Sequence, residues 1–369
     1  MTDNFNAPLI FIIGGTGAQG IPVIRSLVAD KAYRVRALTR DTNSERAKLL
    51  LALGNVELLD GTFTSKDTLR AGFAGAHGTF VNIDGFNTGE KAEIFWAIRI
   101  YELAYESGVK FFVYGNLDYV HKKSGYDPRL RAGHYDGKGR VGEWILMQSK
   151  DGNGKKMGAA CFTTGPYIDM SIARATITSP TLEDGVVTWR VPLGDSAVAH
   201  VALKDCGHYV RWLFDHPDRA NGLDLEVAID HIRYADLATA FEKVTGKPAR
   251  YVDVSLEEYW ESGPAAHIAG RSSAYNSDPS DPAAMTFKEN FTGFWNIWKY
   301  GGAKDGFLTR DYRLLDEIHP NRIRSAEQWF RLEDERGRKA GLGSLWERVQ
   351  PDNLKPVLKI QEDGFRGNL

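Results

Sequence analysis

Residues Leu9-Ile10-Phe11-Ile12-Ile13 run directly into Gly14-Gly15-Thr16-Gly17-Ala18-Gln19-Gly20 near the start of the chain. Five consecutive apolar residues are typical of a strand that is buried on both faces of a parallel sheet. After the glycines, Ile21, Ile24 and Leu27 recur at helical spacing, so we expect a helix there. A glycine turn between a buried strand and a helix lets the backbone approach a diphosphate, and the N–H groups of the helix N-terminus favour its negative charge.

The glycines follow a G-x-x-G-x-x-G spacing, formed by Gly14, Gly17 and Gly20. Together with the flanking strand and helix, this spacing indicates a dinucleotide-binding turn. The alternative is a tight turn that binds nothing, but such a turn does not need three glycines at this spacing. The residues expected to contact the cofactor in this turn are Gly14, Thr16, Gly17, Ala18, Gln19 and Gly20.

The second strand, expected over residues 33–40, ends at Arg40 and Asp41. In this fold the end of the second strand meets the adenosine ribose of the dinucleotide. An acidic residue there accepts a hydrogen bond from the 2′-hydroxyl of NAD, whereas an arginine grips the 2′-phosphate of NADP with two donors. Because Arg40 comes first, the sequence favours NADP, and Asp41 leaves NAD binding open.

The composition is that of a globular protein without a strong charge bias. Of the 369 residues, 43% are hydrophobic and 25% are charged, and the formal net charge is −2, so neither nucleic acid nor a membrane surface is expected as a partner. Cys161 and Cys206 lack metal-type or redox-type spacing, so we expect reduced thiols. No secretory pattern and no bilayer-length apolar run is found, so the sequence predicts a cytoplasmic protein.

The first half of the chain alternates strand patterns with helical patterns. This rhythm predicts an α/β fold of the Rossmann type, with a doubly wound parallel sheet. We expect strands over residues 9–13, 33–40, 56–59, 78–83, 109–114 and 158–163, and helices over residues 47–53, 67–73, 88–106 and 136–148. Such sheets bind ligands at the carboxyl ends of their strands. Asn82 and Tyr167 lie at such ends, and we expect both to contact the cofactor.

The second half is less regular and predicts a smaller α/β substrate lobe that covers the strand ends. The expected domains are an NADP-binding Rossmann domain over residues 1–165, the smaller lobe, partly interleaved with it, over residues 166–335, and a C-terminal extension over residues 336–369. Short strands are expected over residues 186–191, 200–203 and 223–229, and helices over residues 234–245 and 325–336. Asp205 is expected to cap a helix, and Ser325 with Gln328 to form a capping box.

The region after residue 260 combines a loop with an aromatic stripe. Residues 263–286 are rich in Gly, Ser, Pro, Asp and Ala, which predicts a loop. Phe291, Phe294, Trp295 and Trp298 recur at helical spacing. We favour core packing for this stripe, and the alternative is an aromatic wall for a flat substrate.

Several stretches resemble the NmrA-like family, the atypical branch of the short-chain dehydrogenase/reductase superfamily. The glycine turn and Arg40 are shared with many relatives, whereas His134-Tyr135-Asp136-Gly137-Lys138 is more specific. Phe112-Val113-Tyr114, Val191-Pro192-Leu193-Gly194-Asp195 and Asp205-Cys206-Gly207-His208 also resemble landmarks of the family. The resemblance covers roughly residues 7–260, and it implies a Rossmann domain that prefers NADP.

The resemblance does not settle whether the protein is an enzyme. Typical members of the superfamily use Tyr-x-x-x-Lys, in which the lysine lowers the tyrosine pKa so that the phenol can transfer a proton. Here His134 occupies the tyrosine position of that spacing, and Gly115-Asn116 stands where a helper serine usually lies. Another branch, the isoflavone-reductase-like enzymes, is similar at this place and implies Lys138 as the general acid or base, assisted by His134 or Tyr135. Lys138 is also expected to contact the cofactor.

Two function classes follow from these motifs. The first is an NADPH-dependent reductase of a small aromatic or conjugated organic molecule. The second, implied by the NmrA-type regulators, is a non-catalytic NADP(H) redox sensor that acts on a protein partner. Fold alone does not choose between them.

A metal centre and a serine hydrolase are both disfavoured. His200, Asp205, Cys206 and His208 lie close together in the sequence, but their spacing fits no structural zinc pattern. The G-x-S-x-G turn of serine hydrolases does not occur. We therefore expect no metal.

Overall fold

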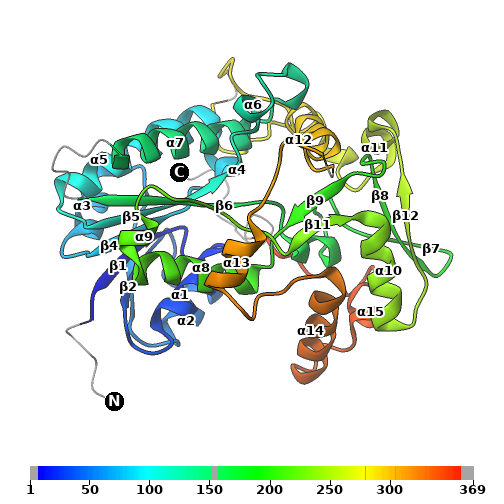
Figure 1. The fold of residues 1–369 in the computed structure, drawn as a ribbon, viewed down its shortest axis with the longest axis horizontal. Helices are drawn as coiled ribbons and strands as arrows, with labels where there is room; N and C mark the ends of the chain where they lie inside the picture. Colours follow the sequence, from blue (N-terminus) through cyan, green and yellow to red (C-terminus); the bar gives the residue numbers. More distant parts are fainter. Residues whose placement is uncertain (1–6, 151–156, 279, 304, 359–369) are drawn as a thin grey trace.

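The computed structural model describes residues 7–150, 157–278, 280–303 and 305–358, and a seven-stranded parallel sheet forms its centre (Figure 1). The strand order is β10-β6-β5-β4-β1-β2-β3. The strands are β1 (Leu9–Ile13), β2 (Arg34–Thr39), β3 (Val56–Asp60), β4 (Gly78–Val81), β5 (Phe111–Leu117), β6 (Gly158–Thr164) and β10 (Asp224–Glu226). The order reverses at β1, where Ile12 pairs with Ala37 of β2 and with Phe80 of β4. Doubly wound sheets bind dinucleotides at such a reversal.

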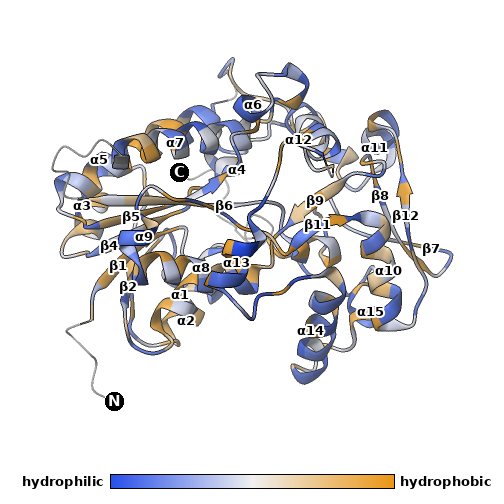
Figure 2. Cartoon of the chain, in the orientation of Figure 1, coloured by the Kyte–Doolittle hydropathy of each residue, from blue (hydrophilic) through white to orange (hydrophobic). Residues whose placement is uncertain are grey.

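Helices cover both faces of this sheet (Figure 1). One face carries α1 (Gly20–Val28), α2 (Glu45–Leu51) and α8 (Leu203–Asp215), and the other carries α3 (Lys66–Phe73), α5 (Glu90–Glu106) and α7 (Gly133–Lys150). Residues of β1 alternate between them, since Ile10 and Ile12 pack with α1 and α8, whereas Phe11 and Ile13 pack with α3, α5 and α7. Figure 2 shows hydrophobic colours along the central strands and hydrophilic colours on outer helices such as α14 (Ala326–Lys339). The predicted fold class is confirmed.

Two helices of the first half differ from their expected bounds. The helix expected over residues 88–106 is divided into α4 (Gly85–Thr88) and α5, because Gly89 takes a positive φ of 78° between them. The helix expected from residue 136 already begins at Gly133, and a short helix, α6 (Val120–Lys123), precedes it together with a 3₁₀ turn, η1 (Pro128–Leu130). His134, Tyr135 and Lys138 therefore all lie in the first two turns of α7.

The second half forms a smaller lobe of short strands and helices. One sheet has the order β12-β8-β7, and a second pairs β9 with β11. The strands are β7 (Thr181–Glu183), β8 (Val186–Val191), β9 (Ala197–His200), β11 (Asp230–Arg233) and β12 (Ala249–Asp253). The helices are α9 (Pro217–Ala220), α10 (Tyr234–Thr245), α11 (Leu256–Ser262), α12 (Phe287–Gly301), α13 (Tyr312–Ile318), α14 and α15 (Leu345–Arg348), with 3₁₀ turns η2 (Ile168–Ile172) and η3 (Ala266–Ile268).

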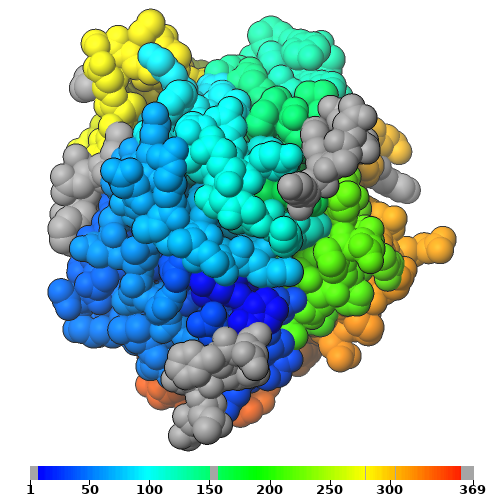
Figure 3. Space-filling model, turned by 90° about the vertical axis from the view of Figure 1, so that its left-hand side faces the viewer, coloured from blue at the N-terminus to red at the C-terminus, as the bar shows by residue number. Residues whose placement is uncertain are grey.

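Part of the second half returns to the central sheet. Helix α8 packs on α1, and β10 pairs in parallel with β6. The strand expected over residues 223–229 is shorter, since β10 ends at Glu226, and the next strand, β11 in the smaller lobe, begins only at Asp230. Figure 3 views the molecule from the end that carries the central sheet, and the blue and cyan N-terminal half forms most of that face, bordered by green chain from the middle of the sequence. Helix α14 runs through residue 335, so the expected boundary there falls within a helix.

Two expected caps and one strand are corrected by tertiary contacts. Helix α8 begins at Leu203, and Asp205 lies inside its first turn, where Oδ2 accepts a hydrogen bond from the N–H of Ile323 at 2.9 Å. The strand expected over residues 200–203 lies earlier in the chain, as β9, which ends at His200. Residue 203 already belongs to α8. Ser325 caps α14 as expected, but the Gln328 side chain accepts from the N–H of Arg324 rather than closing the box.

Within the segment expected to be a loop, residues 275 and 276 contact helix α4. The N–H of Tyr275 donates to the carbonyl of Phe86 at 2.9 Å, and the N–H of Asn276 donates to that of Asn87 at 3.0 Å. All four residues of the aromatic stripe of α12 are buried in the core of the smaller lobe, so the expected core packing is confirmed. The Phe291 and Phe294 rings also approach His134.

Candidate functional site

The three glycines of the first turn have different physical roles. Gly14 has a φ of 85°, and a Cβ on it would overlap the carbonyl oxygen of Asn82. A Cβ on Gly20 would lie 2.7 Å from Cα of Gly15, so α1 and the turn meet backbone to backbone. On Gly17, the nearest atom to a Cβ is the Gly14 carbonyl oxygen at 3.1 Å, and nothing else described lies within 4 Å. Packing therefore explains Gly14 and Gly20, whereas a Cβ on Gly17 would have one close neighbour, the Gly14 carbonyl oxygen, and would otherwise be uncrowded.

The N-terminus of α1 is open to an anion. Gln19 stands at the N-cap position with helical dihedral angles, and its side chain makes no capping hydrogen bond within the described chain. The first turn of α1 contains no acidic residue. The positive end of the helix dipole therefore faces the turn without a side-chain cap, although the Ile21 N–H already donates to the Gly17 carbonyl oxygen and Pro22 has no N–H. With the open face of Gly17 beside it, this cradle fits the diphosphate of a dinucleotide.

Four of the expected cofactor residues form one continuous chain of hydrogen bonds. The Gln19 amide donates to the Tyr167 hydroxyl at 3.4 Å, and the Asn82 amide donates to Oε1 of Gln19 at 2.9 Å. The Lys138 ammonium then donates to Oδ1 of Asn82 at 3.3 Å. The structure thus brings together residues from α1, α7 and the ends of β4 and β6 at one edge of the sheet.

The Lys138 ammonium is almost enclosed, since only 8% of this residue is exposed. Besides Asn82, it donates to the carbonyl oxygens of Ile83 at 2.8 Å and Gly115 at 3.2 Å. It also lies 2.8 Å from Oε1 of Glu93, a fully buried residue of α5. Sequence reasoning missed Glu93, because nothing in the sequence distinguishes it from the other glutamates of its helix.

His134 lies at the aromatic side of the site and is neutral near pH 7. Burial lowers its pKa to about 4, although a hydrogen bond to Asn290 opposes this shift. Nδ1 lies 3.0 Å from Oδ1 of Asn290, and this acceptor assigns the ring proton to Nδ1 and leaves Nε2 as an acceptor. The ring contacts Phe86, with centroids 4.8 Å apart, and Phe291, with centroids 5.3 Å apart.

Tyr135 lies apart from this chain of hydrogen bonds. Only 1% of it is exposed, and it packs in the core of the smaller lobe beside Phe294. Burial raises the pKa of its phenol far above the usual range. A buried phenol that holds its proton this firmly is poorly suited to proton transfer.

The basic end of the site contains one residue that sequence reasoning missed. Arg40 follows β2 directly and is partly buried. Arg46 of α2 lies near it in the chain, and its guanidinium donates to the carbonyl oxygen of Thr16 at 3.2 Å. This contact places a second positive charge against the glycine turn, on the side expected to meet the adenosine phosphate.

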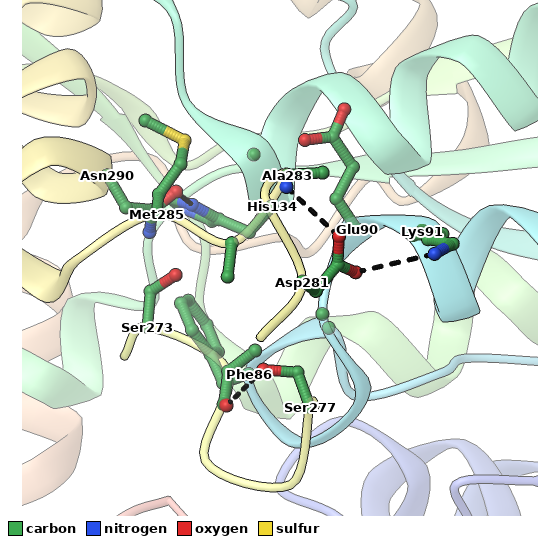
Figure 4. A pocket seen from close by; sticks show the side chains of 15 residues that line it. Phe86, Glu90, Lys91, His134, Ser273, Ser277, Asp281, Ala283, Met285 and Asn290 are labelled. Atoms are coloured by element: carbon green, nitrogen blue, oxygen red, sulfur yellow. Dashed lines mark hydrogen bonds and ion pairs between the residues drawn. The ribbon is translucent and has the colours of Figure 1, made fainter. Parts of the chain in front are cut away.

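A small pocket adjoins His134 and is covered by the segment 273–285 (Figure 4). Phe86, His134, Met285 and Asn290 line it together with Glu90 of α5. Its cavity volume of about 30 Å³ admits a water molecule or two and not an aromatic ring. Within the ranges that the structure describes, no cluster of three His, Cys, Asp or Glu residues is arranged to hold a metal ion. No helix in those ranges is long and apolar enough to cross a membrane.

Comparison with known proteins identifies the family. The sequence profile of the NmrA-like family matches residues 6–272. The chain is 30% identical over 253 residues to the NmrA-like family domain-containing oxidoreductase lnaB of Aspergillus flavus, covering 66% of this chain and 75% of the relative. It is also 30% identical over 264 residues to hkm9 of Aspergillus hancockii, which has the same description, covering 69% and 76%.

Solved structures agree in fold. NmrA, a negative transcriptional regulator, superposes with a TM-score of 0.70 at 17% identity, covering 92% of this chain and 99% of the other. The NADPH-dependent quinone oxidoreductase QOR2 of Escherichia coli, solved with NADPH, superposes with a TM-score of 0.63 at 20% identity, covering 87% and 98%. With the family profile spanning most of its length, the chain belongs to the NmrA-like family.

Proposed function

We propose that the protein is an NADP(H)-dependent oxidoreductase that reduces a small aromatic or conjugated organic molecule. The observation that carries this proposal is the chain of hydrogen bonds from Tyr167 through Gln19 and Asn82 to Lys138. It joins the glycine turn to an ammonium at the place where a nicotinamide ring would lie in this fold. The oxidoreductase relatives and the NADPH-bound quinone oxidoreductase support the same activity.

The cofactor would be held by the residues of the turn and the second strand. The open face of Gly17 and the uncapped N-terminus of α1 receive the diphosphate, with the backbone of Gly14, Thr16 and Ala18 around it. Arg40, with Arg46 close by, binds the 2′-phosphate of NADP. When bound, NADPH supplies a hydride to the substrate.

Lys138 has two tasks in this proposal. Its ammonium binds the nicotinamide ribose and donates a proton to the substrate atom that becomes negative as hydride arrives. Gly115 and Asn82 contribute the longest of its hydrogen bonds, at 3.2 and 3.3 Å, and these are the ones a ligand replaces most easily. His134, neutral and with Nε2 as an acceptor, orients a donor group on the substrate rather than supplying the proton.

The class of substrate follows from the rings around His134. Phe86 and Phe291 are stacked, with centroids 5.6 Å apart and planes at 10°. Such parallel rings suit a flat, apolar molecule. Because the adjoining pocket admits only water, a substrate displaces part of the segment 273–285 as it enters.

The second candidate is an NADP(H) sensor that binds a protein partner without turnover. The enclosed ammonium of Lys138 and the buried phenol of Tyr135 favour it, because neither group reaches solvent freely. The likeness in fold to a negative transcriptional regulator supports it as well. Under either function we place the protein in the cytoplasm, since both of its cysteines are buried free thiols.

One experiment separates the two functions. NADPH, NADP⁺ and NAD⁺ are titrated against the protein, and carbonyl and enone compounds are then screened by the loss of NADPH absorbance. Turnover that Lys138→Ala abolishes supports the reductase. Tight binding of NADPH without turnover of any compound supports the sensor, and no binding of any dinucleotide contradicts both.

A further inference from the structure

Glu93 is a buried carboxylate for which the fold alone gives no reason. It lies in the first turn of α5 and is fully buried, with its side chain directed toward α7 and the end of β4. Gly137 faces this carboxylate, since a Cβ on Gly137 would lie 3.6 Å from Oε2, and a Cβ on Gly85 would overlap that oxygen. Two glycines therefore leave the space that the carboxylate occupies.

Among the described residues, the Glu93 carboxylate is paired with Lys138, whose Nζ lies 2.8 Å from Oε1. No hydrogen bond from any other described residue reaches either carboxylate oxygen. Burial of a charged group is costly unless an opposite charge and further hydrogen bonds compensate it. A gain in stability therefore does not explain a buried carboxylate that has one ion pair and no further hydrogen-bond donor, and such groups are often found at functional sites.

The surroundings of the pair are mostly negative or neutral. Asp84 after β4 and Glu90 of the same helix are the nearest other carboxylates, and Glu90 is ion-paired with Arg131 and Arg140. From β5, the Tyr114 ring faces the ammonium, with its centroid 5.5 Å from Nζ. Burial raises the pKa of Glu93, and the charge of Lys138 opposes that rise. Lys138 is thus the one cation in direct contact with the Glu93 carboxylate among the described residues.

We propose that Glu93 is a positioning residue that holds the Lys138 ammonium at the cofactor edge. The proposal rests on the function assigned to Lys138 above. Without the Glu93 carboxylate, the ammonium would lose the charged partner that lies 2.8 Å from it, while Asp84 would remain as a second carboxylate in its surroundings. Glu93 itself touches neither cofactor nor substrate.

The test compares NADPH affinity at a fixed pH in four proteins, of which the wild type is one. Glu93→Gln removes the charge and keeps the shape, Glu93→Asp keeps the charge on a shorter side chain, and Glu102→Gln removes a charge from an exposed ion pair with Arg99 on the same helix. In Glu93→Gln, we expect NADPH binding to weaken by roughly tenfold, because the ammonium is no longer held by a charged partner. Glu93→Asp should recover part of that affinity, and Glu102→Gln should match the wild type.

An NADPH affinity of Glu93→Gln equal to that of the wild type overturns the proposal. For a substrate found in the screen, a positioning role also predicts that Glu93→Gln lowers kcat more than it raises KM. If Glu93→Gln does not fold, Glu93→Met, which also removes the charge and has a similar length, takes its place in the comparison. If the wild type binds no NADPH, the proposed function fails. The pairing of Glu93 with Lys138 is then tested by the free energies of unfolding of Glu93→Gln, Lys138→Met and the double variant. A coupling free energy near zero between the two substitutions contradicts the pairing.

Discussion

The Cα of Gly15 lies 2.7 Å from the point that a Cβ would occupy on Gly20, so the glycine turn and the first turn of α1 are in backbone contact. Gly17, between them, has no such neighbour. The same motif therefore contains two glycines that the packing requires and one, Gly17, for which we propose a role in cofactor binding. Substitution of one kind of glycine should lower the stability of the fold, and substitution of the other should weaken cofactor binding. The spacing of the glycines alone does not distinguish these two outcomes.

The first prediction concerns these glycines. Gly17→Ala should fold with a melting temperature close to that of the wild type, because its Cβ meets only the Gly14 carbonyl oxygen at 3.1 Å. It should weaken NADPH binding at least tenfold, or about 1.4 kcal/mol, because the methyl group occupies the diphosphate cradle. Gly20→Ala should instead lower the stability by about 1–3 kcal/mol through overpacking. Calorimetry and thermal unfolding measure both, and equal NADPH affinity in Gly17→Ala and wild type contradicts the role of the cradle.

The second prediction concerns the choice of cofactor. Arg40→Ala should weaken NADP binding by roughly 10- to 100-fold, as expected for loss of a charged hydrogen bond of about 1.5–3 kcal/mol, and should leave NAD binding nearly unchanged. Arg34→Ala is the matched control, since Arg34 lies at the opposite end of β2 and donates to the Ala7 carbonyl oxygen at 3.3 Å. Fluorescence titration with each dinucleotide is the measurement. Equal losses for NADP and NAD would argue against a phosphate contact.

The sequence predicted the Rossmann half well because its signals are local. The apolar run of β1, the glycine spacing and the strand-helix rhythm each depend on neighbours in the chain. The same is true of the group formed by Gln19, Asn82, Tyr167 and Lys138, since a parallel sheet brings its strand ends to one edge. Predicting the fold class was therefore enough to predict that Asn82 and Tyr167 lie near the glycine turn, whereas Lys138, in α7, was expected from the resemblance to the NmrA-like family.

What the sequence did not predict depends on contacts between distant segments. Glu93 is distinguished from Glu90 only by the tertiary position of Lys138. Asp205 is of a residue type that often caps helices, but its carboxylate accepts a hydrogen bond from the N–H of Ile323, far along the chain. The return of β10 to the central sheet has the same cause, because three residues paired with β6 carry no pattern of their own.

A third prediction follows from the low pKa of His134. Its pKa in the folded protein is about 4, below the unfolded value of 6.5, so the unfolded state binds the extra proton between these values. This contribution to stability is therefore present above pH 6.5 and is lost as the pH falls toward 4. His134→Gln should reduce the stability loss between pH 7 and pH 5 by about 1–2 kcal/mol. Urea unfolding at both pH values measures it, and an unchanged pH dependence in the variant means that His134 is not held neutral by the fold.

The last prediction concerns the ion pair that ties the C-terminal third to the end of β5. Arg310 and Asp118 both have fully buried side chains, and their closest contact is Nη2 to Oδ2 at 2.7 Å. Removing one partner of such a pair leaves a buried charge, so Arg310→Met should destabilise the protein by about 3–5 kcal/mol. Lys123, 2.7 Å from Oδ1 of Asp118, partly compensates the remaining carboxylate and favours the lower end of that range. Asp118→Asn with Arg310→Met should be less destabilising than the sum of the single changes, because the pair is then removed together. Urea denaturation of the three variants tests this, and additive losses would show that the two residues stabilise the protein independently.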